Sequence, residues 1–228
     1  MAANAREIIE GLREEIRRIE RRPAQRSDRA SSGRGEIDAL LPGGGFPRGA
    51  LSELAGGPAS GKTAVALTTL ATAMAEDGFG AFVDGRGELY PPAAAALGID
   101  LDRLLVVRPL ASPREGGTGE AARRALWAAE ALLASGAFEV VAIDIPLEVA
   151  RRQALAPAGV EAMLRRLRAA AEKGGSVGLW LGALEGVRAP VAVRLELAAG
   201  ADGAQVRRTF ARGADDVPPA MIVVHHAA

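Results

Sequence analysis

The chain has 228 residues, of which 49% are hydrophobic and 25% charged, and its 28 basic residues balance its 28 acidic residues. This composition is typical of one globular domain with a small appendage, and the charge balance gives no indication of a nucleic-acid or membrane partner. The sequence contains no cysteine, which excludes disulfides, thiolate zinc sites and a cysteine nucleophile. Because its start is highly charged and it has no apolar run of about 18 residues, we expect a cytoplasmic protein without a signal peptide or membrane span.

Residues 1–22 are predicted to form an amphipathic N-terminal helix. Its apolar side chains recur at three- and four-residue steps, at Ile8, Ile9, Leu12, Ile16 and Ile19. The pattern leaves open whether this helix packs on its own domain or docks on another chain. Pro23 ends it, and residues 23–35, which are polar and lack apolar periodicity, are predicted to be a linker.

Residues 36–228 are predicted to be one core in which strands and helices first alternate. The predicted strands of this part are Ala50–Ala55, Phe79–Asp84, Leu104–Arg108, Glu139–Asp144 and Val177–Leu181. The predicted helices are Lys62–Glu76, Pro92–Leu97, Gly119–Ser135 and Val160–Lys173.

Three segments near the C-terminus then follow one another with no helix between them and alternate apolar with polar residues, namely Ala192–Ala198, Gln205–Ala211 and Met221–His225. We therefore expect an α/β fold with a mostly parallel central sheet and antiparallel C-terminal strands. Trp127 and Trp180 are predicted to lie in its core.

The clearest motif is GGPASGKT at residues 56–63, a complete G-x-x-x-x-G-K-[ST] between a predicted strand and a predicted helix. In this context the backbone N–H groups of the loop converge on phosphate oxygens, and the positive end of the following helix reinforces them. The expected ligands are therefore ATP or ADP with Mg²⁺. The predicted nucleotide-binding residues of the loop are Gly56, Gly57, Pro58, Ala59, Ser60, Gly61, Lys62 and Thr63.

Two predicted strands end in an aspartate, at Asp84 and Asp144. Ligands of open α/β sheets lie at the carboxyl ends of the strands, so we expect both acids at the nucleotide site. Asp144 is the better magnesium partner because four apolar residues precede it, and its metal site would be shared with Thr63. Asp84 is as readily interpreted as an acid that caps the next turn.

Beyond these motifs, the sequence resembles the RecA recombinase family over most of residues 36–226. The matching stretches are GEIDALLPGGGFPRGALSELAGGPASGKTA, FVDGRGELYPPAAAALGIDLDRLLVVRP, SGAFEVVAIDIP and AVRLEL. The run from Gly35 to Pro109 is the specific part, because a generic phosphate-loop ATPase does not share its GGGFPRG and LGIDLDRLLVVRP segments. The resemblance implies a RecA-like core, with nucleotide bound by Gly56–Thr63 and magnesium coordinated through Thr63 and Asp144.

One departure from the family bears on catalysis. RecA proteins carry a glutamate that orients the attacking water two residues after the aspartate of FVDGRGE, and here that position is Arg86. A guanidinium group cannot accept a proton or align a water molecule through lone pairs. Glu88, two residues later, is the remaining candidate catalytic acid, and it could serve only if the loop is rebuilt. We therefore expect nucleotide binding with slow or absent hydrolysis.

Other departures bear on DNA. The segments that match the family's two DNA-binding loops are the short stretches IPLEVARRQALAPAG and GALEGVRAP, so we expect DNA contact to be weak or indirect. We also expect no counterpart of the family's C-terminal domain.

With these features the chain is most similar to RecA-like accessory proteins of the ImuA type. That similarity implies a role in the SOS response to DNA damage, in error-prone translesion synthesis and mutagenesis. Its expected partners are an ImuB-like polymerase homologue and RecA itself. Two alternatives stay open: a DNA-dependent ATPase that acts as a minimal recombinase or recombination mediator through Glu88, and a nucleotide-free scaffold.

Overall fold

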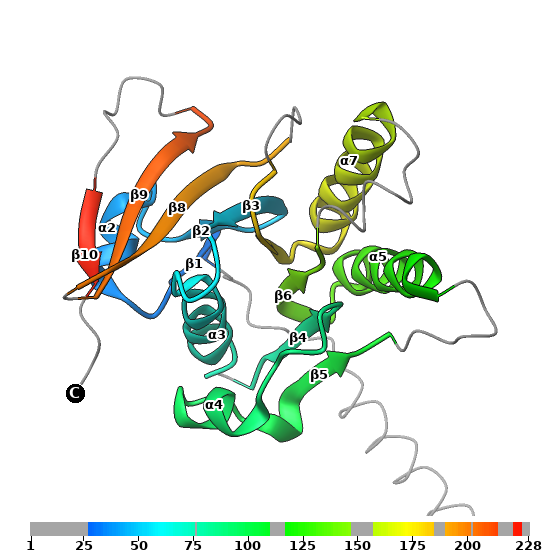
Figure 1. The fold of residues 1–228 in the computed structure, drawn as a ribbon, viewed down its shortest axis with the longest axis horizontal. Coiled ribbons are helices and arrows are strands. Elements are labelled where there is room, and N and C mark those ends of the chain that lie inside the picture. The colour runs from blue at the N-terminus through cyan, green and yellow to red at the C-terminus, as the bar shows by residue number, and fades with distance from the viewer. Residues whose placement is uncertain are drawn as a thin grey trace, which may run out of the picture.

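The computed structural model describes residues 27–75, 77–109, 117–146, 157–184, 190–201, 203–213 and 221–224, so the predicted helix over residues 1–22 lies outside the described residues. Its centre is an eight-stranded sheet (Figure 1). In spatial order the strands are β10 (Met221–Val224), β9 (Gly203–Ala211), β8 (Val193–Gly200), β3 (Ala50–Ala55), β7 (Val177–Leu181), β6 (Phe138–Asp144), β4 (Phe79–Asp84) and β5 (Leu104–Val107).

Strands β8, β3, β7, β6, β4 and β5 run parallel to their neighbours, whereas β8, β9 and β10 pair antiparallel. The predicted mixed sheet is therefore confirmed. Every residue of β7 is buried, because helices cover both faces of the parallel strands. In β8, by contrast, the first residues alternate between buried and half-buried positions, as the alternating sequence predicts.

Helices cover the two faces of the sheet (Figure 1). Helices α2 (Gly35–Leu40), α3 (Lys62–Ala73) and α4 (Pro91–Ala96) contribute to one hydrophobic cluster, and α5 (Gly117–Ser135) and α7 (Pro157–Gly174) to the other. Successive residues of β7 point to opposite faces, so Leu179 and Leu181 belong to the first cluster and Trp180 to the second. Within the described residues, no helix combines the length and apolarity needed to cross a bilayer.

The two tryptophans differ in burial. Trp180 is fully buried, as predicted, but Trp127 on α5 is 70% exposed, so its assignment to the core is wrong. Helix α5 is rich in alanine, and because alanines occur on several of its faces, the sequence pattern does not identify the face that packs on the sheet. Residues such as Ala125 and Ala129 make that contact instead.

The segment predicted as a linker over residues 23–35 differs from a linker where the structure describes it, from Ser27 onward. Strand β1 (Arg29–Ala30) pairs antiparallel with β2 (Phe46–Pro47), and α2 already begins at Gly35. Asp38 of α2 accepts hydrogen bonds from the Ser31 hydroxyl and the Ser32 backbone N–H. A strand of two residues is too short to produce a periodic pattern, which is why the sequence did not reveal it.

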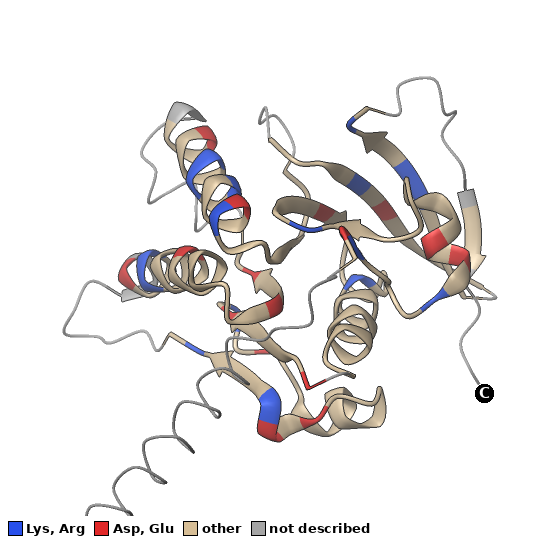
Figure 2. Cartoon of the chain, turned by 180° about the vertical axis from the view of Figure 1, so that it is seen from behind, with Lys and Arg blue, Asp and Glu red and all other residues tan. Residues whose placement is uncertain are grey.

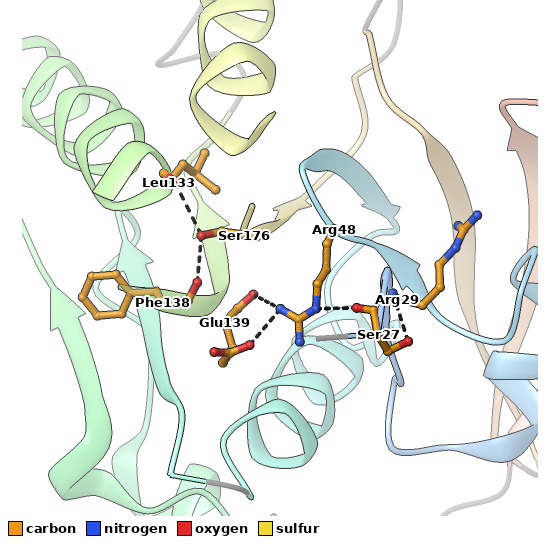
Figure 3. A network of polar contacts seen from close by, with 7 residues as sticks. All are labelled: Ser27, Arg29, Arg48, Leu133, Phe138, Glu139 and Ser176. Atoms are coloured by element: carbon orange, nitrogen blue, oxygen red, sulfur yellow. Dashed lines mark hydrogen bonds and ion pairs between the residues drawn. The ribbon is translucent and has the colours of Figure 1, made fainter. Parts of the chain in front are cut away.

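A polar network fastens this segment at the amino ends of the parallel strands (Figure 3). The Arg48 guanidinium donates to the Ser27 carbonyl oxygen at 3.0 Å and pairs with the Glu139 carboxylate at 2.8 Å. Beside it, the buried Ser176 hydroxyl donates to the Phe138 carbonyl oxygen at 2.7 Å. These contacts close one end of the sheet and leave the carboxyl ends of the strands for a functional site.

Candidate functional site

The loop between β3 and α3 carries the predicted phosphate-binding motif at the carboxyl end of the sheet. Gly61 has a φ of +88° and caps α3 without any side-chain hydrogen bond, and Ala59 also has a positive φ. The first backbone N–H groups of a helix have no partner within the helix, so they face the loop. This conformation forms an anion-binding cradle that the positive end of the helix dipole reinforces.

The base of this loop is packed too closely for a side chain at Gly56. A Cβ there would lie 2.4 Å from Ser60 Oγ and 2.6 Å from the Leu197 carbonyl oxygen of β8. Ser60 Oγ is buried and has no hydrogen-bond partner among the described residues. A buried hydroxyl without a hydrogen-bond partner destabilises a folded protein unless a ligand or a water molecule forms a hydrogen bond with it.

Lys62 and Thr63 lie at the start of α3, where the motif places them. The Lys62 ammonium donates to the Gly57 carbonyl oxygen at 3.0 Å, so the side chain folds back over the loop. Both residues are only half-buried and remain accessible to a ligand. The loop, its lysine and its unpaired hydroxyl therefore fit the phosphates of a nucleotide.

Asp144 ends β6 and lies in register with Asp84 on the neighbouring strand β4. The Arg86 Nε donates to Asp144 Oδ1 at 2.8 Å. The Asp144 side chain is 7% exposed and that of Arg86 33%, so the ion pair is partly buried. Arg86, at the position where the family resemblance implies a catalytic glutamate, is thus bound to the acid predicted to hold magnesium.

Burial raises the pKa of Asp144 above its ordinary value, and the hydrogen bond and charge of Arg86 act in the opposite direction. The positive charge of Lys62 also opposes the rise. The negative charge of Asp84 adds to the rise.

Asp84 caps the turn that follows β4. Its Oδ1 accepts the N–H groups of Gly87 at 2.8 Å and Glu88 at 3.0 Å, and its Oδ2 accepts that of Leu89 at 3.1 Å. Arg108 forms an ion pair with Oδ2 at 2.7 Å, and the Asp84 side chain is fully buried. These bonds match the interpretation of Asp84 as a capping acid, and its contact with a nucleotide stays a prediction.

Glu88 lies in this same turn with an exposed side chain. Its backbone N–H is held by Asp84, but the structure records no hydrogen bond or ion pair of its carboxylate with any described residue. From the sequence, Glu88 is a candidate catalytic acid only if the loop has a different conformation from that of the family. Its catalytic role stays a prediction.

The two aspartates do not fit a magnesium shell as they stand. Mg²⁺ requires octahedral oxygen ligands, yet Asp84 is saturated by hydrogen bonds and Asp144 is bound by Arg86. At an effective dielectric constant of about 20, a +1 and a +2 charge about 5 Å apart repel by about 7 kcal/mol. Within the described part of the chain, no group of three or more His, Cys, Asp or Glu residues could hold a metal. The magnesium role predicted for Thr63 and Asp144 would require Arg86 to leave.

Sequence reasoning missed three charged residues around this site: Glu53, Arg108 and Arg194. Glu53 on β3 is buried, and its carboxylate accepts the Leu184 N–H at 2.8 Å and the Arg194 Nε at 2.6 Å. A cavity of about 610 Å³ beside Gly56 and Gly57 is lined in part by this ion pair. A charged residue in the middle of a strand predicted to be buried was the signal that could have identified Glu53.

Comparison with known proteins connects this geometry to one family. Residues 10–159 match the RecA N-terminal domain. Protein RecA of Corynebacterium aurimucosum is 44% identical over 114 residues, which is 50% of this chain and 28% of that protein. Protein RecA of Clostridioides difficile is 41% identical over 117 residues, or 51% of this chain and 31% of that protein.

A third relative, Protein RecA of Brevibacillus brevis, is 43% identical over 115 residues, covering 50% of this chain and 30% of that protein. The matched stretch thus spans less than a third of the length of these curated relatives.

Proposed function

Because this chain belongs to the RecA N-terminal domain family, we propose that it is a cytoplasmic protein that binds ATP or ADP and hydrolyses ATP slowly or not at all. The observation that carries the proposal is the bond between Arg86 and Asp144. The phosphate loop keeps its cradle and its lysine, which supports binding. The position where the family resemblance implies a water-orienting glutamate holds a cation instead.

This replacement removes the proton acceptor from the position to which the family resemblance assigns it. A general base must lie within hydrogen-bond reach of the attacking water, and its loss typically lowers a rate by about 10²–10⁴-fold. The Arg86 guanidinium has only donors, and it points its Nε at the nearest buried carboxylate. One oxygen of Asp144, Oδ1, is therefore engaged by this bond as well.

We propose further that the protein acts as an accessory factor in the DNA-damage response and error-prone translesion synthesis, in the manner of ImuA-type proteins. Its partners would be an ImuB-like polymerase homologue and RecA, with DNA contacted indirectly. Support for indirect DNA contact comes from the sequence, in which the segments that match the two DNA-binding loops are short. These segments lie largely outside the described residues.

The surface over α5 and α7 supports a role through protein contacts. A groove of about 610 Å³ lies between the two helices, which pack side by side. Its lining residues are Glu120, Arg123, Arg124, Leu126, Trp127, Glu130, Gly159, Ala162, Met163, Arg166 and Leu167. Figure 2 shows basic and acidic residues along both helices.

Within this groove the arginines are exposed, whereas the glutamates that pair with them are mostly covered. Arg123 pairs with Glu120 on α5, and Arg166 of α7 pairs with Glu130 of α5. The accessible rim is therefore positive, and the exposed Trp127 adds an aromatic anchor point. We assign the groove to an acidic segment of the protein partner that carries an apolar anchor side chain.

Steady-state hydrolysis measurements test this function. Turnover of ATP with Mg²⁺ should stay at the level of a Lys62→Ala control, both without and with single-stranded DNA. Fast turnover that single strands stimulate and that Glu88→Gln abolishes would favour the minimal recombinase instead. Binding of neither ATP nor ADP by the full chain would favour the nucleotide-free scaffold.

A further inference from the structure

Each aspartate at the carboxyl edge of the sheet is paired with an arginine of this chain. Asp144 is bound by Arg86 at 2.8 Å and Asp84 by Arg108 at 2.7 Å. Lys62, the first residue of α3, adds a third cation at the phosphate loop. Each aspartate is therefore already paired with a cation of this chain before any metal binds.

The geometry of Arg86 leaves its outer end available. Its bond to Asp144 uses Nε, the inner nitrogen of the guanidinium, and the side chain is 33% exposed. The structure records no bond of its two terminal NH₂ groups with any described residue. A planar guanidinium fork matches phosphate oxygens through paired hydrogen bonds, and it stays charged at every physiological pH.

The polyphosphate chain of a nucleotide needs a cation beyond the loop lysine. In phosphate-loop proteins a magnesium ion bridges the β- and γ-phosphate oxygens and neutralises their charge. Here the acid that would hold that ion is occupied by an arginine, while the phosphate cradle itself is intact.

We infer that Arg86 supplies the positive charge that Mg²⁺ supplies in related sites, so that this chain binds ATP or ADP as a metal-free polyphosphate anion. Asp144 then holds Arg86 in place instead of holding a metal. The inference rests on the proposed nucleotide binding, and it adds the chemical form of the ligand and the residue that selects it.

Calorimetric titration of the full chain with ADP, in buffer with Mg²⁺ and in buffer with EDTA, tests the inference. The two dissociation constants should agree within about threefold. Addition of Mn²⁺ to the complex, followed by electron paramagnetic resonance, should show metal bound no more tightly than by free ADP. A larger loss of affinity in EDTA, or tight Mn²⁺ binding, would overturn the inference.

Two matched arginine variants locate the effect. In EDTA, Arg86→Gln should weaken ADP binding by about tenfold to a hundredfold, the value of a charge-assisted hydrogen bond to phosphate. Mg²⁺ should restore part of that loss, because Asp144 is then available to a metal. Arg108→Gln should bind ADP equally in both buffers, since Asp84 keeps its three backbone donors.

The possible results separate the inference from the proposed function. Circular dichroism melts first confirm that both variants fold, and Lys62→Ala defines the level of no binding. An Arg86→Gln protein that binds like the wild type in both buffers would overturn the inference alone. Wild-type binding that requires Mg²⁺ would do the same and leave the proposed function standing. Failure of the wild type to bind in either buffer would overturn both.

Discussion

Removing the carboxylate of Asp84 should lower the free energy of unfolding more than the same change at an exposed acid. The side chain is fully buried and holds three backbone N–H groups and Arg108. In Asp84→Ala the buried N–H of Leu89 loses its acceptor, which costs about 1–3 kcal/mol. The other two N–H groups and Arg108, whose side chain is 44% exposed, can turn to water and lose less. We expect a total loss of about 3–5 kcal/mol.

For a domain of this size a loss of about 4 kcal/mol lowers the melting temperature by about 8–16 °C. The assay is chemical and thermal unfolding followed by circular dichroism and tryptophan fluorescence, so that coincident transitions justify a two-state analysis. Asp84→Asn, which keeps Oδ1 and its two bonds, should lie between the wild type and the alanine variant.

Asp100 supplies the matched control. It accepts similar bonds, from the Asp102 N–H at 3.0 Å and Arg103 Nε at 2.9 Å, but its side chain is 45% exposed. Asp100→Ala should therefore change the melting temperature little. An Asp84→Ala protein within about 1 kcal/mol of the wild type, or an equal effect at Asp100, would refute the capping role.

Three further results are expected. ADP at about 100 times its dissociation constant should stabilise the wild type by about 2.7 kcal/mol, and Lys62→Ala should remove that stabilisation; an unchanged thermal shift would place the nucleotide elsewhere. Because the folded-state pKa of Asp144 is raised, the folded protein holds this proton more tightly than the unfolded chain, so stability is lost as pH rises above about 4. Thermal melts at pH 4 and pH 7 should therefore show that the stability of Asp144→Asn, relative to that of the wild type, is higher at pH 7 than at pH 4. A lower relative stability of the variant at pH 7 would contradict the direction of the pKa shift. Trp127→Ala should weaken binding of a purified ImuB-like partner by about thirtyfold with no loss of stability. Leu101→Ala, which removes an exposed apolar side chain elsewhere, should not; loss of single-stranded DNA binding in the tryptophan variant would instead assign the groove to nucleic acid.

The elements of the core were predictable because their patterns are local. Strands β3, β6 and β7 are short, mostly apolar runs bounded by turns, and the phosphate loop is a continuous motif whose flanking elements are part of its definition. The antiparallel strands β8 and β9 are recognisable from their alternation of apolar and polar residues.

The pairing of charges at the site was not predictable from local pattern. Arg86 and Asp144 are 58 positions apart in the chain and meet only because β4 lies beside β6 in the sheet. The order of strands follows from how all the elements pack, and neither periodicity nor propensity contains it. The sequence identified Arg86 as a departure from the family, but only the structure shows that its partner is the acid expected to bind metal.

A single-turnover experiment tests the central claim most directly. The full chain is mixed in excess with radiolabelled ATP, Mg²⁺ and single-stranded DNA, and the labelled nucleotide is analysed after quenching at intervals. We predict that the label is recovered as ATP throughout. Recovery of ADP and free phosphate at rates typical of a working ATPase, about 1 s⁻¹ or faster, would show that the site retains a catalytic base and contradict the account.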